Sequence, residues 1–172
     1  MPVTTEADGV LEHVDNGWRL RFTRRLAHPP DKVWRAITEA AHRDAWFPQR
    51  IEGEWRVGAP LKFVSDNGDF EGEVLVYEPP SVVEFRWGTD VIRLEVRGEG
   101  SGSVLTLLDT FAEQGKAARD AAGWHACLDL LETALAGQSP TWNSGERWQA
   151  VHPGYVEKFG PKAATIGPPS KD

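Results

Sequence analysis

The sequence is poor in several features, and each shortage excludes a class of protein. Its 172 residues include a single cysteine, so the chain cannot form an internal disulfide framework. No apolar run approaches the length of about 20 residues that a membrane-spanning helix needs, and the first residues show no basic segment followed by an apolar one. We therefore expect a cytoplasmic protein without a membrane span.

Motifs for metals, phosphates and nucleophiles are also missing. The five histidines do not lie at ligand spacing from one another, and no cysteine pair accompanies them. The sequence contains neither a glycine-rich phosphate loop after a strand nor a G-x-S-x-G elbow. A net charge of −7 argues against nucleic acid as a partner. We expect no metal, no cofactor and no catalytic constellation.

The only cysteine lies in the stretch GWHACLDLL, residues 123–131, close to a histidine and an aspartate. On a helix, residues two apart point in different directions, so His125 and Cys127 diverge. Cys127 falls on the apolar stripe, whereas His125 and Asp129 are four apart and are expected to meet on a flank beside solvent. The pattern favours a packed helix over a thiol active site, which would need a group that lowers the pKa of the thiol.

The hydrophobic period changes along the chain and predicts an α+β fold. Residues 18–26 alternate like a strand, and Pro30 suits the first position of two short helices that end before Pro48. Residues 51–111 contain short alternating runs separated by turns, with no helix to connect parallel neighbours. The runs are EWRVG, PLKFVSD, DFEGEVLVYEPP, SVVEFRWG, VIRLEVRG and SVLTLLDTF. An antiparallel meander of about seven strands follows, and a helix over about residues 112–136 completes the order.

Eight tryptophans are unusual for this length, and indoles suit a thick core or a ligand cavity. A curved sheet around one long helix leaves a space between them, and most of the large side chains on the dry face are aromatic. The predicted cavity-lining, ligand-binding residues are Trp46, Phe63, Phe70, Val74, Phe85, Trp87, Leu94, Leu107, Trp124 and Leu128.

Three segments divide the chain. Residues 1–17 are expected to be a partly flexible lead-in, and residues 18–137 the main domain. Residues 138–172 form an extension whose four large aromatic side chains indicate that it packs back on the domain, with a disordered end, GPPSKD.

Five stretches carry a family resemblance by their order and spacing. They are TRRLAHPPDKVWRAIT, AWF, EWRVGAPLKF, FEGEVLVYEPPSVVEFRW and GWHACLDLLETAL. Residues 18–137 thereby resemble the START-like (SRPBCC, helix-grip) superfamily, and within it the group similar to the C-terminal domain of the activator of the 90-kDa heat-shock protein ATPase. The resemblance implies a curved antiparallel sheet wrapped around a long C-terminal helix, with an apolar cavity that members use for lipids, sterols, polyketides and plant hormones.

Two charged residues lie at positions where the alternation of their predicted strands points the side chain inward. Arg24 alternates in step with Leu20, and Asp109 with Leu107, so we predict an ion pair or hydrogen bond between Arg24 and Asp109 at the end of the cavity. This pair would be a structural plug or a polar anchor for a ligand.

The favoured function is the binding of a small hydrophobic, amphipathic or lipid-like molecule. One alternative is a cyclase or dehydratase that uses polar groups in the cavity, Asp109 foremost and His125 after it. The other is a co-chaperone-like module that binds a protein partner through Trp142 and Trp148; a homodimer is left open as well. The sequence does not decide between them.

Overall fold

The structure is a computed structural model that describes residues 7–66 and 68–166. Asn67, in the predicted turn between the runs PLKFVSD and DFEGEVLVYEPP, lies outside the described residues, and so does the tail GPPSKD, predicted to be disordered.

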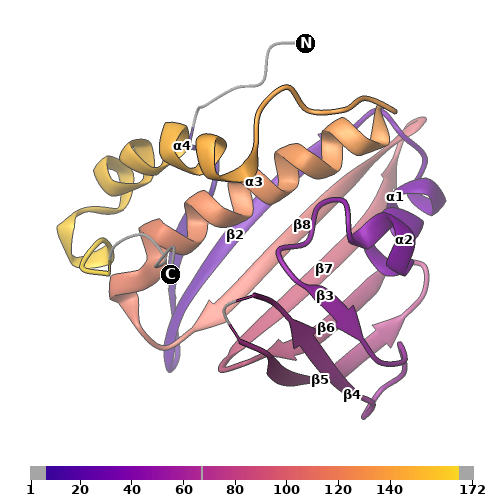
Figure 1. The fold of residues 1–172 in the computed structure, drawn as a ribbon, viewed down its shortest axis with the longest axis horizontal. Coiled ribbons are helices and arrows are strands. Elements are labelled where there is room, and N and C mark those ends of the chain that lie inside the picture. The colour runs from indigo at the N-terminus through magenta and orange to yellow at the C-terminus, as the bar shows by residue number, and fades with distance from the viewer. Residues whose placement is uncertain (1–6, 67, 167–172) are drawn as a thin grey trace.

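Within the described residues, one antiparallel sheet of eight strands forms the first layer of the fold (Figure 1). Its order is β1-β2-β8-β7-β6-β5-β4-β3, so the predicted meander is confirmed and the strand count is eight rather than about seven. The strands are β1 Val10–Val14, β2 Gly17–Leu26, β3 Arg50–Glu52, β4 Pro60–Val64, β5 Phe70–Glu78, β6 Val82–Trp87, β7 Asp90–Glu99 and β8 Gly102–Phe111.

Two details of the predicted sheet were wrong. The lead-in contains a strand, β1, which pairs with β2 across a two-residue turn. The run EWRVG, residues 54–58, is not a strand, and the short strand β3 precedes it. The glycines around that run explain the difference, because Gly53 and Gly58 have φ of 137° and 84°, conformations that interrupt an extended chain.

The helices form the second layer. They are α1 Pro30–Thr38, α2 Ala40–Arg43, α3 Ala117–Leu135 and α4 Ser144–Phe159, with short 3-10 turns at Gln114–Lys116 and Pro161–Ala163. Figure 1 shows α3 lying across the sheet, with α1 and α2 near one of its ends. Its 19 residues span about 28 Å, and the preceding 3-10 turn explains why α3 begins later than predicted. Among the described residues, no helix is long and apolar enough to span a membrane.

The extension after residue 137 contributes α4, which packs against α3 (Figure 1). Asn143 caps this helix, since its Oδ1 accepts the backbone N–H of Glu146 at 2.8 Å and its amide donates to the Glu146 carboxylate at 2.6 Å. Val151 and Tyr155 are fully buried. Helix α4 therefore covers a flank of α3 that would otherwise face solvent.

Candidate functional site

All ten predicted cavity-lining residues lie in one core between the sheet and α3. Eight of them are buried, with at most 3% of the side chain exposed, and only Phe70 and Trp87 are partly buried. The alternation of the strands and the stripe on α3 thus predicted correctly that these side chains pack together. Their part in ligand binding stays a prediction.

The residue at the centre of these rings, Phe47, was not among the predicted set. Its ring centroid lies 5.5 Å from that of Trp46, 6.3 Å from Phe63, 6.4 Å from Trp87 and 5.7 Å from Trp124. Such spacings are those of rings in contact. Protein side chains therefore occupy the middle of the region between the sheet and α3, and an open space lies beside this ring cluster.

That space is a cleft of about 190 Å³, here called the aromatic cleft. It is lined by Pro48, Trp87, Arg119, Asp120, Gly123, Trp124, Cys127 and Trp148. Trp87 and Trp124 belong to the predicted set, whereas the other eight predicted residues are not part of the lining. The main contribution that was missed is Trp148 of α4. The aromatic residues of the extension indicated that it packs back on the domain. They did not show which face of the domain α4 covers, and so they did not place Trp148 in the cleft.

The three indoles of the aromatic cleft are held by hydrogen bonds from their N–H groups. Trp87 Nε1 donates to Gln49 Oε1 at 3.0 Å, and Trp124 Nε1 donates to Asp109 Oδ2 at 2.9 Å. Trp148 Nε1 donates to a backbone carbonyl of α3 at 3.0 Å. Each indole N–H therefore already has an acceptor within the protein, and the three rings contribute apolar surface to the cleft.

Behind Trp124 lies a buried group of charges. Asp109 is fully buried, and one oxygen each of Asp90, Asp109 and Asp120 lies within 4.8 Å of the others. Burial and the neighbouring Asp90 carboxylate raise the pKa of Asp109 well above its usual range, although the bond from Trp124 acts in the opposite direction. This environment favours the neutral, protonated form of Asp109.

The three carboxyl groups have the spacing of a cation site, but a lysine already supplies the positive charge. Lys116 Nζ lies 2.7 and 2.8 Å from the two oxygens of Asp90 and 3.4 Å from Asp120 Oδ2. The ammonium compensates Asp90, the Arg119 guanidinium lies 3.0 Å from Asp120 Oδ1, and the third carboxyl group, Asp109, is stabilised in its neutral form. The cluster is therefore complete as a structural element without a metal.

The predicted pairing of Arg24 with Asp109 was wrong. Across the β2–β8 ladder, Arg24 lies opposite Leu105, whereas Asp109 lies opposite Leu20. Four residues of strand separate the two positions, or about 13 Å, which is too far for a direct contact. Strand alternation predicted that both side chains lie on the inner face of the sheet. It does not specify how far along neighbouring strands each residue lies, so it could not show whether they meet.

Arg24 instead binds three carboxylates. Its guanidinium lies 2.8 Å from Asp8, 2.9 Å from Asp129 and 2.6 Å from Glu132. Burial lowers the pKa of Arg24, but the attraction of Asp8, Asp129 and Glu132 outweighs this and raises the pKa above its usual value. The residue joins β2 to α3 and to the segment before β1.

His125 does not lie beside solvent as predicted, because α4 covers it. The ring is fully buried, its Nδ1 lies 2.7 Å from the Tyr155 hydroxyl and 3.2 Å from Asp8, and its Nε2 lies 3.4 Å from Asp129. The same hydroxyl accepts the backbone N–H of Gly9 at 3.1 Å. His125 thus belongs to the junction of the N-terminal segment, α3 and α4, away from the aromatic cleft.

Cys127 has the packed environment that its helical position predicted. Burial raises the pKa of its thiol to about 12. The side chain forms part of the wall of the aromatic cleft but stays a thiol at neutral pH, so it contributes apolar surface rather than a nucleophile.

The sequence of the central part of this fold identifies its family. Residues 27–136, more than half of the chain, match the Activator of Hsp90 ATPase homolog 1-like protein family. The chain belongs to this family. The fold is of a ligand-binding type, and the START-like resemblance of the sequence is confirmed. No curated protein matches the chain by sequence.

Solved structures share the fold. A conserved protein of unknown function from Enterococcus faecalis superposes with a TM-score of 0.73 at 18% identity, covering 88% of this chain and 90% of the other. CalU16 from Micromonospora echinospora gives 0.65 at 23% identity, with 84% and 94% covered. A protein from Bordetella parapertussis gives 0.65 at 26% identity, with 91% and 94% covered. Within this Activator of Hsp90 ATPase homolog 1-like chain, α4 and Trp148 lie beyond the residues that match the family.

Proposed function

We propose that this protein binds a small aromatic or amphipathic molecule in the aromatic cleft. The observation that carries the proposal is the set of three indoles, Trp87, Trp124 and Trp148, whose N–H groups are all bonded within the protein. Rings fixed in this way lose little conformational entropy when a ligand stacks on them. The site is preorganised for flat apolar surface.

The size of the cleft limits the ligand. Ligand pockets usually hold about 300–1,000 Å³, so a cleft of about 190 Å³ suits a compact ring system or one end of a longer molecule. Burying about 200 Å² of apolar surface contributes about 5 kcal/mol, and the cost of immobilising the ligand offsets much of this, so burial alone gives weak binding. Polar contacts with Arg119 or Asp120 would tighten binding and orient the polar end of an amphipathic ligand.

The same geometry supports binding over the enzymatic alternative. Asp109 is the acid that a cyclase or dehydratase would use, yet its side chain is fully buried and is not part of the cleft lining. Trp124 donates to it from the layer that faces the cleft. A general acid must come within hydrogen-bond reach of its substrate, and this arrangement separates the two.

The co-chaperone-like alternative also finds less support. Trp148 forms a wall of the cleft, and the Arg147 guanidinium lies 4.2 Å from the centre of the Trp142 ring, so both indoles have internal roles. Among the described residues, the large hydrophobic side chains that are exposed are Val10 and Val57, which lie on different parts of the surface. Two separate residues do not form the contiguous apolar patch that marks a protein interface.

A pair of substitutions at Gly123 tests the proposal. A Cβ built on Gly123 meets no atom within 4 Å, and the residue lines the cleft in the middle of α3. Gly123→Leu should fill the cleft and abolish binding of 2-naphthol, whereas Gly123→Ala should retain most of it. Binding is read from the indole N–H signals in ¹H–¹⁵N spectra. The proposal fails if wild-type signals of Trp87, Trp124 and Trp148 do not shift, or if Gly123→Leu binds the probe as well as Gly123→Ala does.

A further inference from the structure

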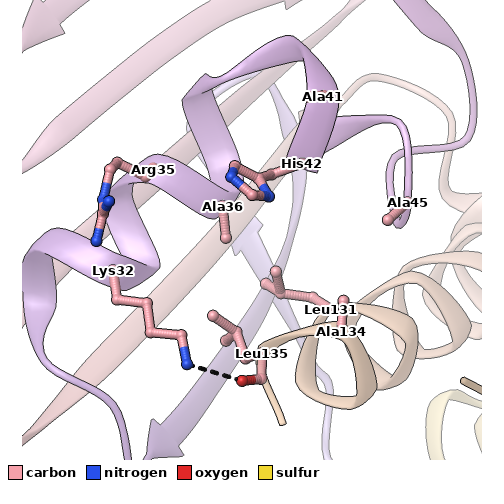
Figure 2. Close-up of a pocket in the computed structure, with 9 residues that line it drawn as sticks. All are labelled: Lys32, Arg35, Ala36, Ala41, His42, Ala45, Leu131, Ala134 and Leu135. Carbon is pink, nitrogen blue, oxygen red and sulfur yellow. Dashed lines mark hydrogen bonds between the residues drawn. The ribbon is translucent and has the colours of Figure 1, made fainter. Parts of the chain in front are cut away.

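A second hollow lies at the other end of α3, between that helix and the α1–α2 pair (Figure 2). This cleft measures about 290 Å³ and is here called the cationic cleft. Its apolar side chains are all aliphatic: Ala36, Ala41, Ala45, Leu131, Ala134 and Leu135. An aliphatic surface without rings suits an alkyl chain, in contrast to the aromatic cleft.

The polar side chains of the cationic cleft all have basic character. Lys32 and Arg35 of α1 and His42 of α2 line it, and no carboxylate belongs to the lining. The protein as a whole carries a net charge of −7, so this local excess of basic groups stands against the general composition. A negatively charged ligand is the one that such a lining favours.

The two basic side chains that α1 contributes to the cationic cleft, Lys32 and Arg35, differ in how strongly they are already bound within the protein. Lys32 Nζ donates to the backbone carbonyl of Leu135 at 2.9 Å, and Figure 2 shows this bond across the cleft. The ammonium therefore offsets the negative end of the α3 dipole, which would otherwise repel an anion. Arg35 has weaker contacts: its Nε donates to the Asp31 carbonyl at 3.4 Å, and its guanidinium lies 3.9 Å from the Asp31 carboxylate, with both side chains largely exposed. Its planar guanidinium can bind a carboxylate through two parallel hydrogen bonds.

We infer that the cationic cleft binds a short aliphatic carboxylate. The carboxylate pairs with Arg35, with Lys32 and His42 nearby, and the alkyl chain lies over Leu131 and Ala134. The volume is near the lower limit for ligand sites, which limits the chain to about eight carbons. This site uses none of the residues that line the aromatic cleft, so the inference does not depend on the proposed function.

The test is to titrate octanoate, octylamine and 2-naphthol separately into ¹⁵N-labelled protein. It shows whether the cationic cleft selects an aliphatic carboxylate over an aliphatic amine or an aromatic ring. Octanoate should shift backbone signals of residues 32–45 and 131–135, and octylamine should leave them unchanged. Arg35→Gln should weaken octanoate binding about tenfold, because one charge-assisted contact is lost. Arg97→Gln is the matched control, since Arg97 is similarly exposed and has a similarly long ion pair, 3.7 Å to Glu99. It should bind octanoate as the wild type does.

A filling substitution locates the site independently of charge. Ala134 is exposed on α3 and lines the cleft, so Ala134→Phe should preserve the fold and block octanoate. The inference is overturned if octylamine binds as well as octanoate, if Arg35→Gln or Ala134→Phe leaves octanoate binding unchanged, or if octanoate shifts nothing. Octanoate shifts confined to Trp87, Trp124 and Trp148 would also overturn it, while leaving the proposed function intact.

Discussion

Replacing Arg24 by methionine tests how the buried ion network stabilises the fold. Methionine keeps much of the length and apolar stem of arginine but removes the charge. Asp129, with 3% of its side chain exposed, would then keep only longer contacts, 3.4 Å to His125 and 3.7 Å to Arg147. Removing one partner of a buried ion pair costs about 3–5 kcal/mol, because the remaining charge stays desolvated. For a protein of this size the Tm should fall by about 10 °C.

Urea unfolding followed by tryptophan fluorescence measures this loss, with Arg97→Met as the control. Arg97 is 66% exposed, so its replacement should change the free energy of unfolding by less than about 0.5 kcal/mol. A loss below about 1 kcal/mol in Arg24→Met, similar to the control, would refute the reasoning. It would mean that the desolvation cost of the arginine cancels the attraction of its three carboxylates.

The network also has a pH dependence. Burial raises the pKa of Asp8, but contacts with His125 and Arg24 outweigh it and hold the pKa below the ordinary value of 3.8. A carboxylate with a depressed pKa contributes stability that is present above its unfolded pKa and is lost as the pH falls through its folded pKa. The acid-induced loss of stability below about pH 4 should therefore be smaller in Arg24→Met than in the wild type.

Two further predictions concern buried titratable groups. The pKa of Asp109 is raised in the folded protein, so its contribution to stability is present below its unfolded pKa and decreases as the pH rises. Asp109→Asn should accordingly be more stable than the wild type at pH 8, by about 1–3 kcal/mol, and this gain should shrink toward pH 4; equal urea midpoints at pH 8 would contradict the assignment. Cys127, whose pKa burial raises to about 12, should not react with a thiol reagent such as Ellman's reagent until urea unfolds the protein. Rapid modification of the native protein at pH 8 would show that the thiol is accessible.

Local patterns were sufficient for most of the architecture. Alternation over residues 70–111 predicted strands β5 to β8, and the absence of connecting helices predicted their antiparallel order. The apolar stripe on α3 placed Trp124 and Leu128 toward the sheet, where both are buried. These features depend on the periods of the helix and the strand, which are properties of neighbouring residues.

The details that were wrong depend on contacts between distant segments. Asp109 and Arg24 share an inner face, but the β2–β8 register decides that they do not meet. His125 was expected on an exposed flank because nothing in its own helix shows that α4 would cover it. The hairpin of β1 with β2 was missed, although the residues Asp15-Asn16-Gly17 carry the chemistry of a tight turn.

The sequence by itself determined the α+β class, the antiparallel sheet, the long helix and the identity of the aromatic side chains between them. Only the tertiary structure decided that Phe47 occupies the middle of these rings, that Trp148 of α4 forms a wall of the remaining cleft, and that Arg24 binds carboxylates from α3 and from the N-terminal segment. The physical reason is that side-chain periodicity specifies which face a residue occupies, whereas register and helix docking specify what lies opposite it.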